Sequence, residues 1–332
     1  MRALVTGATG FIGSRLALRC LREGSQVVAL GRRNSPGELE NAGELEAAGI
    51  AIHDVPVEDR DALREHMKDV DVAFHLAAAQ HEANVPDEYF RRINVEGTRN
   101  VCEAATAAGV PRLVYGSTIG VYGWRPGETV SNDSPEAPDN IYGITKLAAE
   151  AVVREAGARL PFAIARISET YGPGDRRLLK LFRGVARGLC LEIGPARNLH
   201  HLVYVEDLID GLVSAAREPG ALGKTFVLAG REPVTTRAML EAISRSLGRQ
   251  PRVLRVPLSP LLWTAAALET ALRPLGVQPP LHRRRMDFFR KSFAFRLDDA
   301  QAFGFAPRVG LQEGMDLTAR WYTDRALLSA AA

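Results

Sequence analysis

Up to about residue 165 the chain alternates between short apolar runs and longer stretches with helical periodicity. The apolar runs mostly lack period-2 alternation, as expected for strands of a parallel sheet that is buried on both faces. Strand–helix alternation of this kind predicts an α/β fold with a doubly wound parallel sheet. The predicted strands are Ala3–Val5, Val27–Leu30, Ala51–His53, Val72–His75, Leu113–Tyr115 and Phe162–Ala165, and helices are predicted between them at positions such as Ile12–Glu23, Tyr89–Ala108 and Ile141–Ala158.

The pattern becomes less regular after the stretch from Tyr171 to Arg177, where loops that carry proline and glycine separate the helical stretches. Two further strand patterns, His200–Val205 and Lys224–Gly230, indicate that the chain returns to the first domain. We therefore expect a first domain over residues 1–175 and a smaller C-terminal lobe over 176–332, with segments near 200–230 in the core domain. The helices predicted in this part are Leu178–Arg187, Val205–Arg217, Thr236–Leu247 and Leu261–Leu272.

Composition excludes several classes of protein. The formal charge of +3 is too small to indicate a nucleic-acid partner, and no basic run is interleaved with aromatic residues. The three cysteines are far apart and form no CxxC pair, so we expect reduced thiols and neither a disulfide framework nor a metal site. No signal-peptide pattern and no run of 18 apolar residues is found, which predicts a cytoplasmic protein.

Three glycines, Gly7, Gly10 and Gly13, lie between the first predicted strand and the first predicted helix. Glycines allow a tight turn here, and the helix N-terminus offers unpaired N–H groups and a partial positive charge to a pyrophosphate. The GxxGxxG spacing is one residue longer in its first gap than the common dinucleotide fingerprint. A purely structural turn is the alternative, but the strand–loop–helix context favours a Rossmann-type dinucleotide-binding domain.

The end of the second predicted strand indicates which dinucleotide is preferred. In such folds an acidic residue at this place binds the adenosine ribose of NAD, whereas an arginine accommodates the 2′-phosphate of NADP. Here the position is Gly31, followed by Arg32 and Arg33. A guanidinium binds phosphate in a bidentate manner, so we favour NADP(H) over NAD(H). The alternative is that both arginines are solvated loop residues.

Tyr142 and Lys146 have a YxxxK spacing on a predicted helix, which puts both side chains on one face. A phenol has a pKa of about 10, and a fixed cation nearby favours its ionised form and so makes it a usable acid or base. This spacing occurs often by chance on surface helices. It gains weight here because Ser117 and Thr118 lie at the carboxyl end of the fifth predicted strand, where ligands of open α/β sheets bind.

Six motifs occur in a fixed order: the glycine loop, HLAA (His75 to Ala78), NVEGT (Asn94 to Thr98), ST…VYG (Ser117 to Gly123), YGITK (Tyr142 to Lys146) and YGPGD (Tyr171 to Asp175). Together they resemble the extended short-chain dehydrogenase/reductase superfamily, in its epimerase/dehydratase-like branch, over nearly the whole chain. The resemblance implies that Tyr142 is the acid/base, that Lys146 is its electrostatic partner and ribose ligand, and that Thr118, four residues before Tyr122, orients the substrate oxygen.

The resemblance also implies the remaining site residues and a homodimer formed through the helices predicted at Tyr89–Ala108 and Ile141–Ala158. Asp54 and Val55 match the place that contacts the adenine, and Asn94 matches an asparagine that supports the site. The expected cofactor-binding residues are Gly7, Thr9, Gly10, Phe11, Ile12, Gly13, Arg32, Arg33, Asp54, Val55, Leu76, Ala77, Ala78, Tyr142, Lys146 and Ile167, and the expected substrate-binding residues are Gln80, Thr118, Glu169 and His200.

The substrate side departs from the nucleotide-sugar enzymes of this superfamily. Glu169 stands where they carry an asparagine, and His200 stands where they often carry an arginine, so a diphosphate pocket is weakened. A one-residue slip of the match, or compensation by Arg176, Arg177 or Arg197, is the alternative. The stretch from Asn198 looks closer to the 3β-hydroxysteroid and sterol dehydrogenases.

The segment from Pro257 to Phe289 is an apolar helix pattern with a basic, aromatic sequel. We interpret it as an ordinary helix of the lobe, while a roof over an apolar pocket or contact with a membrane surface stays an alternative. The function we expect is hydride transfer between a nicotinamide cofactor and a small molecule, a secondary alcohol or ketone. The alternatives are a nucleotide-sugar epimerase or dehydratase that retains its cofactor, and a non-catalytic dinucleotide sensor.

Overall fold

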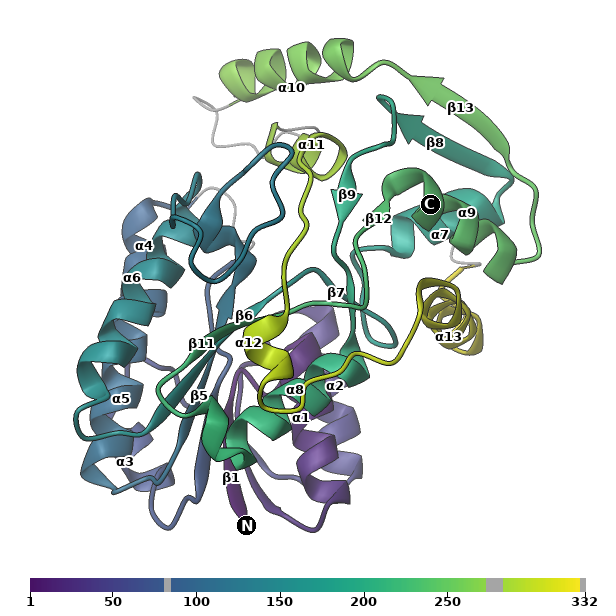
Figure 1. The fold of residues 1–332 in the computed structure, drawn as a ribbon. Helices are drawn as coiled ribbons and strands as arrows, with labels where there is room; N and C mark the ends of the chain where they lie inside the picture. Colours follow the sequence, from purple (N-terminus) through teal and green to yellow (C-terminus); the bar gives the residue numbers. More distant parts are fainter. Residues whose placement is uncertain (81–84, 273–282, 329–332) are drawn as a thin grey trace.

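A seven-stranded parallel sheet forms the centre of the protein in the computed structural model, which describes residues 1–80, 85–272 and 283–328 (Figure 1). The strand order is β11-β6-β5-β4-β1-β2-β3. From β1 the chain first adds strands on one side of the sheet and then, from β4 on, adds them on the other side, as in doubly wound folds. The strands are β1 (Arg2–Thr6), β2 (Gln26–Leu30), β3 (Ile52–His53), β4 (Val72–His75), β5 (Leu113–Thr118), β6 (Phe162–Ile167) and β11 (Thr225–Leu228).

Helices cover both faces of this sheet (Figure 1). Helices α1 (Phe11–Arg22) and α8 (Val205–Arg217) pack together on one face, and α3 (Arg60–His66), α5 (Gly97–Ala107) and α6 (Ile141–Ala156) pack on the other. Each face has its own cluster of buried apolar side chains. Helices α2 (Pro36–Ala47), α4 (Asp87–Arg91) and α12 (Asp298–Gln301) complete this part.

The fold class predicted from the sequence is confirmed. All six strands predicted before residue 170 pair in the sheet, and β5 and β6 extend further than expected, to Thr118 and Ile167. The helix predicted at Tyr89–Ala108 is interrupted by a π-helical segment, η1 (Arg92–Glu96), which places Asn94 inside the protein.

The single strand predicted at His200–Val205 is wrong. The chain forms two short strands instead, β9 (Leu199–His200) and β10 (Val203–Tyr204), which pair outside the main sheet with β12 (Val234–Thr235) and β7 (Thr170–Tyr171). The break includes His201, whose carbonyl accepts a 2.6 Å hydrogen bond from the Ser168 hydroxyl. The second predicted return, β11, does join the main sheet beside β6.

A smaller group of elements lies beyond the carboxyl ends of the main strands (Figure 1). Its apolar core lies among α7 (Leu179–Ala186), α9 (Thr236–Ser246) and α13 (Leu311–Asp324). Strands β8 (Leu189–Ile193) and β13 (Arg252–Val256) pair in parallel, and α10 (Leu258–Leu272) and α11 (Arg283–Arg290) follow them in the chain.

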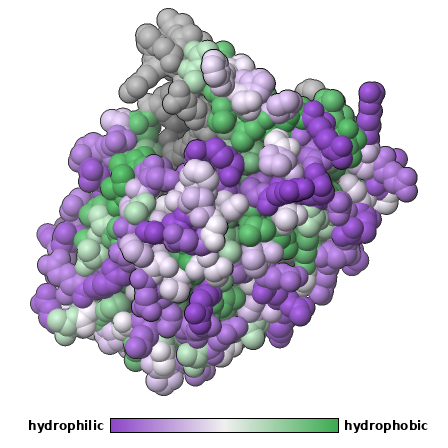
Figure 2. Space-filling view, turned by 45° about the horizontal axis from the view of Figure 1, so that its top comes forward, coloured by the Kyte–Doolittle hydropathy of each residue, from purple (hydrophilic) through white to green (hydrophobic). Residues whose placement is uncertain are grey.

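Part of the segment interpreted as a lobe helix, residues 273–282, lies outside the described residues. Within its described part, Ala265 of α10 is buried whereas the Trp263 side chain is 80% exposed. A view turned toward this end shows hydrophobic residues interspersed with hydrophilic ones (Figure 2). None of the helices in the described ranges has the length and apolar character that crossing a bilayer requires.

Candidate active site

The glycine loop is a tightly packed turn that leads into α1. Gly7 has a φ of +68°, and a Cβ added at Gly13 would lie 2.1 Å from the Gly7 carbonyl oxygen, so no other residue fits there without a backbone shift. Helix α1 begins at Phe11 with no side-chain cap and no acidic residue in its first turn. Its first N–H groups, those of Phe11 and Ile12 among them, have no acceptor within the helix, and this geometry fits a pyrophosphate.

His75 ties the glycine loop to the end of β4. Its Nδ1 lies 2.7 Å from Thr6 Oγ1, and its Nε2 lies 2.9 Å from Thr98 Oγ1. The Thr6 oxygen accepts the N–H groups of Leu76 and Ala77, and therefore donates its own proton to the ring. Burial, and secondarily the Lys146 cation, lower the pKa of His75 to about 3, so the ring is neutral.

These bonds fix the backbone of Leu76 and Ala77 against the loop. A Cβ added at Gly7 would lie 2.9 Å from the Ala77 nitrogen. A Cβ at Gly116 would lie 2.6 Å from Leu76 Cδ2 and 3.4 Å from Ile167 Cδ1, so these two side chains converge above β5. Leu76 and Ile167, which are expected to contact the cofactor, thus lie side by side. The histidine of the HLAA motif, His75, has a structural role because its ring bonds Thr6 and Thr98.

The end of β2 has no room for a side chain. A Cβ added at Gly31 would lie 2.7 Å from Thr9 Oγ1 and 2.8 Å from Thr9 Cγ2. The Gly31 N–H donates to the His53 carbonyl at 3.1 Å, which puts Asp54 and Val55 next to this point. Asp54 is exposed and Val55 is half-buried. The residues expected at the adenosine end are therefore brought together.

Both arginines that follow Gly31 have acidic partners. Arg32 Nη2 lies 3.0 Å from Glu58 Oε2, and Glu58 also faces Arg92 Nε at 3.7 Å. Arg33 pairs with Glu46, at a place where both side chains are largely exposed. Because exposed ion pairs contribute little stability, these contacts leave the guanidinium groups able to exchange partners.

Thr118 and Tyr142 face one cavity of about 280 Å³. Thr118 ends β5, and its Oγ1 accepts the Gly120 N–H at 3.1 Å. Tyr142 lies in the first turn of α6, which Asn140 caps by accepting the Gly143 N–H at 3.1 Å. Three of the expected substrate-binding residues, Gln80, Glu169 and His200, line the same cavity. Ser117 does not line it.

Lys146 lies one turn further along α6 and is almost fully buried. Its Nζ lies 4.1 Å from the centroid of the Tyr115 ring, a cation–π geometry. Burial lowers the pKa of Lys146 to about 7, while the Glu150 carboxylate acts in the opposite direction. Asn94 supports the neighbouring turn, since its amide bonds both the N–H and the carbonyl of Ala79 and also the Thr145 hydroxyl.

The substrate end of the cavity is rich in carboxylates. His200 Nδ1 lies 2.9 Å from Glu169 Oε2, and the histidine is buried whereas about 20% of the glutamate side chain is exposed. Burial alone would raise the pKa of Glu169, but His200 beside it holds that pKa below its usual range. Lys291 is paired at 2.6 Å with Asp139 and at 2.9 Å with Asp287, both of which line the cavity.

Sequence reasoning missed the buried acid of the site, Glu150. It is four residues after Lys146 on the inner face of α6, and its carboxylate bonds Arg166 of β6 and Ser117 of β5. The Tyr142, Lys146, Glu150 spacing was a usable signal, because a charged residue on the buried face of an amphipathic helix needs a partner.

The fold and this geometry are those of a dinucleotide-binding α/β protein in which Thr118 and Tyr142 line one cavity and Lys146 is buried one helical turn after Tyr142. The described parts of the chain contain no group of three or more His, Cys, Asp or Glu side chains that could hold a metal ion. The three cysteines are buried and unpaired.

A model of the NAD dependent epimerase/dehydratase family matches residues 3–229, and the chain belongs to that family. It is 30% identical over 334 residues to the 2-alkyl-3-oxoalkanoate reductase of Shewanella oneidensis, covering 94% of this chain and 84% of the relative. It is also 30% identical over 345 residues to the UDP-glucose 4-epimerase of Mycolicibacterium smegmatis, covering 98% and 99%. The solved UDP-glucuronic acid 4-epimerase from Bacillus cereus in complex with NAD shares the fold, with a TM-score of 0.80 at 22% identity over 98% of this chain and 99% of that one.

The resemblance drawn from the motifs is therefore confirmed, and the protein is an enzyme that uses a nicotinamide dinucleotide. Three features fit such a cofactor: the tight loop before α1, the N–H groups of the first turn of α1 that have no acceptor within the helix, and the buried Lys146 side chain.

Proposed function

We propose that the protein is an NADP(H)-preferring oxidoreductase that moves a hydride between the cofactor and a secondary alcohol or ketone. The observation that carries the proposal is the convergence of Thr118 and Tyr142 on one cavity, with the Lys146 ammonium buried one turn behind Tyr142. In this proposal residues 1–175 bind the cofactor, and residues 176–332 mainly bind the substrate.

The bound nicotinamide supplies or accepts the hydride. In reduction, Tyr142 donates its phenolic proton to the carbonyl oxygen, and the Thr118 hydroxyl donates a hydrogen bond that orients this oxygen. Lys146 stabilises the phenolate form of Tyr142 that remains after proton transfer, and it binds the ribose next to the nicotinamide. In oxidation Tyr142 takes the proton from the alcohol.

The lining of the cavity supports a substrate without a phosphate group. Among the described lining residues, three carboxylates face one ammonium, and that ammonium is already paired with two of them. The third, Glu169, stays ionised beside His200. An anionic substrate group would meet charge of its own sign here, whereas a neutral hydroxyl or a cation would find acceptors.

The cofactor preference is proposed from Arg32. Its contact with Glu58 is partly exposed, so a 2′-phosphate that offers a bidentate, doubly charged partner can replace the carboxylate. Thr9 supports the same preference, because it occupies the space of the acidic side chain that would bind an NAD ribose.

A sugar-nucleotide epimerase is the second candidate, and the 30% identity to an epimerase over 98% of the chain favours it. The two candidates differ in net chemistry. The test is a screen of ketones, secondary alcohols and sugar nucleotides with both cofactors, read by cofactor absorbance and by product analysis. Net oxidation or reduction supports the proposal, and conversion of a sugar nucleotide without change in cofactor absorbance contradicts it.

We also propose a homodimer that forms through α5 and α6. Ile144 on α6 is 40% exposed, which is unusual for a large apolar side chain on a helix that is otherwise packed on the sheet. Contact with a membrane surface through α10 is the weaker proposal, because the apolar surface seen in Figure 2 is interrupted by hydrophilic residues.

A further inference from the structure

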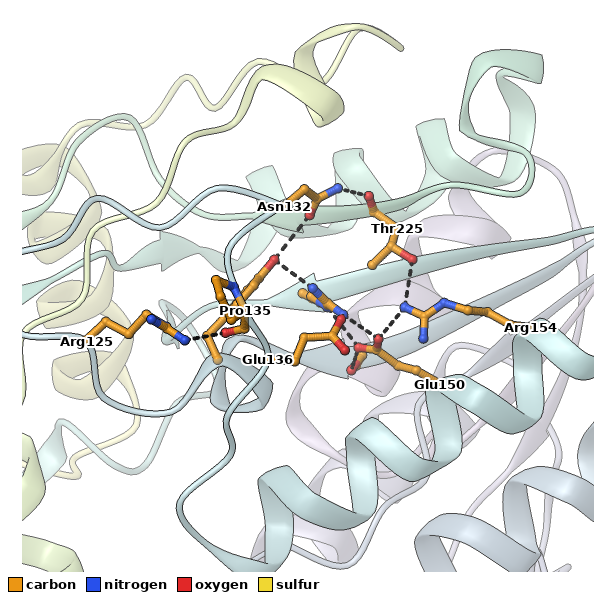
Figure 3. Close-up of polar contacts among 10 residues, drawn as sticks. Arg125, Asn132, Pro135, Glu136, Glu150, Arg154 and Thr225 are labelled. Atoms are coloured by element: carbon orange, nitrogen blue, oxygen red, sulfur yellow. Dashed lines mark hydrogen bonds and ion pairs between the residues drawn. The ribbon is translucent and has the colours of Figure 1, made fainter.

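A buried polar network joins α6 to two strands of the sheet (Figure 3). Its centre is the Glu150 carboxylate, which has no exposed surface and accepts hydrogen bonds from four donor groups. The donors are Ser117 Oγ at 2.5 Å, Arg166 Nε at 3.0 Å, Arg166 Nη2 at 2.7 Å and Arg154 Nη2 at 2.7 Å. A carboxylate with this many donors stays ionised in the core.

Arg166, which is 1% exposed, carries the network further. Its Nη1 donates to the Tyr122 hydroxyl at 2.8 Å, and its Nη2 also pairs with Glu136. Figure 3 shows Glu150 and Arg154 reaching from one helix toward the strands, with Glu136 and Asn132 on the loop opposite. The Glu150–Arg166 pair is thus bonded both from α6 and from the opposite loop. Its position cannot change without moving the sheet or the helix.

Three members of this network are next to residues of the proposed site. Ser117 precedes Thr118 on β5, Arg166 precedes Ile167 on β6, and Glu150 lies one helical turn after Lys146 on α6. The network therefore sets the spacing among the three elements that carry the site. Glu150 and Lys146 are both buried on the same face of α6, one helical turn apart, in surroundings where charges are weakly screened.

Within the described ranges, the titratable groups near Lys146 from β4, β5 and α5 carry no negative charge. Tyr115 presents its ring face from β5, and burial raises the pKa of its hydroxyl, so it is neutral. His75 of β4 is neutral for the reason given above. Burial raises the pKa of Cys102 of α5, which interacts with Tyr115, to about 12, so this thiol is neutral too. On α6 itself, Tyr142 is the remaining titratable neighbour.

We propose that Glu150 is a positioning residue that favours the charged form of Lys146 and holds α6 in register with β5 and β6. This rests on the proposed function in one respect, namely that Lys146 assists Tyr142. Without Glu150, the ammonium would keep its desolvation cost and lose the anion that offsets it. Arg154 and Arg166 would then add repulsion.

The test measures the protonation of Lys146 directly and needs no substrate. The chain has five lysines, so NMR of protein with isotope-labelled lysine gives few side-chain signals, and the Lys146→Met variant identifies the one of interest. The signal is followed against pH in the unmodified protein, in Glu150→Gln and in Arg154→Gln. Arg154→Gln is the matched control, because it removes a half-exposed donor to the same carboxylate and leaves the carboxylate in place.

We expect the proton affinity of Lys146 to fall by about tenfold or more in Glu150→Gln, and not to fall in Arg154→Gln. NADPH affinity at pH 8, measured by fluorescence titration, should fall in the first variant and stay within about twofold in the second. An unchanged Lys146 titration in Glu150→Gln, or an equal fall in both variants, overturns the proposal.

If Glu150→Gln does not fold, the double variant Glu150→Gln/Arg166→Gln replaces it, because this variant leaves no unpaired charge from the pair in the core. The fall in Lys146 proton affinity is expected there too, since Glu150 is one turn from Lys146 whereas Arg166 reaches the carboxylate from β6. No fall in the folded double variant also overturns the proposal. The result is independent of the proposed reaction, so a failed substrate screen does not affect it.

Discussion

The side chain of Thr9 occupies the space that any side chain at position 31 would need. An added Cβ at Gly31 would lie 2.7 Å from Thr9 Oγ1 and 2.9 Å from the Thr9 nitrogen. The absence of an acidic residue at the end of β2 is therefore a matter of packing as well as of charge. Position 31 cannot bind an adenosine ribose through its own side chain while Thr9 is present.

This relationship predicts how the cofactor site responds to an introduced acid. Gly31→Asp alone should weaken the binding of both NADPH and NADH, because the new Cβ displaces the glycine loop. Thr9→Ala/Gly31→Asp removes the contacts with Thr9 Oγ1 and Cγ2 but leaves the Thr9 nitrogen 2.9 Å away, so it should recover only part of the NADH affinity. NADPH binding should stay weak, since the carboxylate repels a 2′-phosphate. Fluorescence titration with the two cofactors measures this. Equal loss for both cofactors in the double variant would contradict the packing argument.

Arg32 and Glu58 lead to an opposed pair of variants. Arg32→Ala should lower the NADPH affinity by about tenfold and change that of NADH little, because a charge-assisted bidentate contact is lost only for the phosphate. Glu58→Gln should instead strengthen NADPH binding, because Arg32 then has no ion pair with Glu58 to break before it binds the 2′-phosphate. Arg33→Ala is the control, and an equal effect of Arg33→Ala would place the phosphate elsewhere.

Removal of the proposed acid/base should separate chemistry from binding. Tyr142→Phe keeps the ring and loses the hydroxyl, so turnover of the substrate found in the screen should fall by about 10²- to 10⁴-fold. The dissociation constant of NADPH should change by less than about threefold, because the glycine loop and Lys146 are unchanged. Thr118→Val serves as the comparison, with a smaller loss. Turnover near that of the unmodified enzyme would remove Tyr142 from the mechanism.

The sheet could be predicted because buried parallel strands are short and apolar throughout, as in Val72–His75 and Leu113–Thr118. Strands β8 and β13 could not, since their burial does not follow apolar character. In β8 Leu189 and Leu191 are exposed whereas Glu192 is buried, and Leu254 of β13 is exposed as well. The strand predicted at His200–Val205 was wrong: the break there includes His201, whose carbonyl accepts a hydrogen bond from the hydroxyl of Ser168, a residue distant in sequence.

The same limit applies to the site. Local spacing indicated Tyr142, Lys146 and the glycine loop, because each motif lies within a single strand–turn–helix or helix segment. The partners of Glu150 could not be read in this way. Ser117 and Arg166 come from two strands, and only the parallel register of β5 with β6, which pairs Ser117 with Arg166, puts both beside α6.

The charge of the cavity leads to a prediction about substrate choice. Three cyclohexanones that carry an amino, a hydroxyl or a carboxylate group at the ring carbon opposite the ketone differ mainly in charge. The ammonium and hydroxyl probes should be reduced with a higher kcat/KM than the carboxylate probe, because Glu169 is ionised and Lys291 is already paired.

Glu169→Gln should reduce the ratio of kcat/KM between the ammonium and carboxylate probes by about tenfold, as expected for the loss of one partly buried charge contact. His200→Arg should favour the carboxylate probe, since it adds a permanent cation beside Glu169. Binding of the three corresponding alcohols, measured by NMR in the presence of NADP, gives the same ranking without turnover. A carboxylate probe that is preferred by the unmodified enzyme would show that the charge of the described lining does not select the substrate.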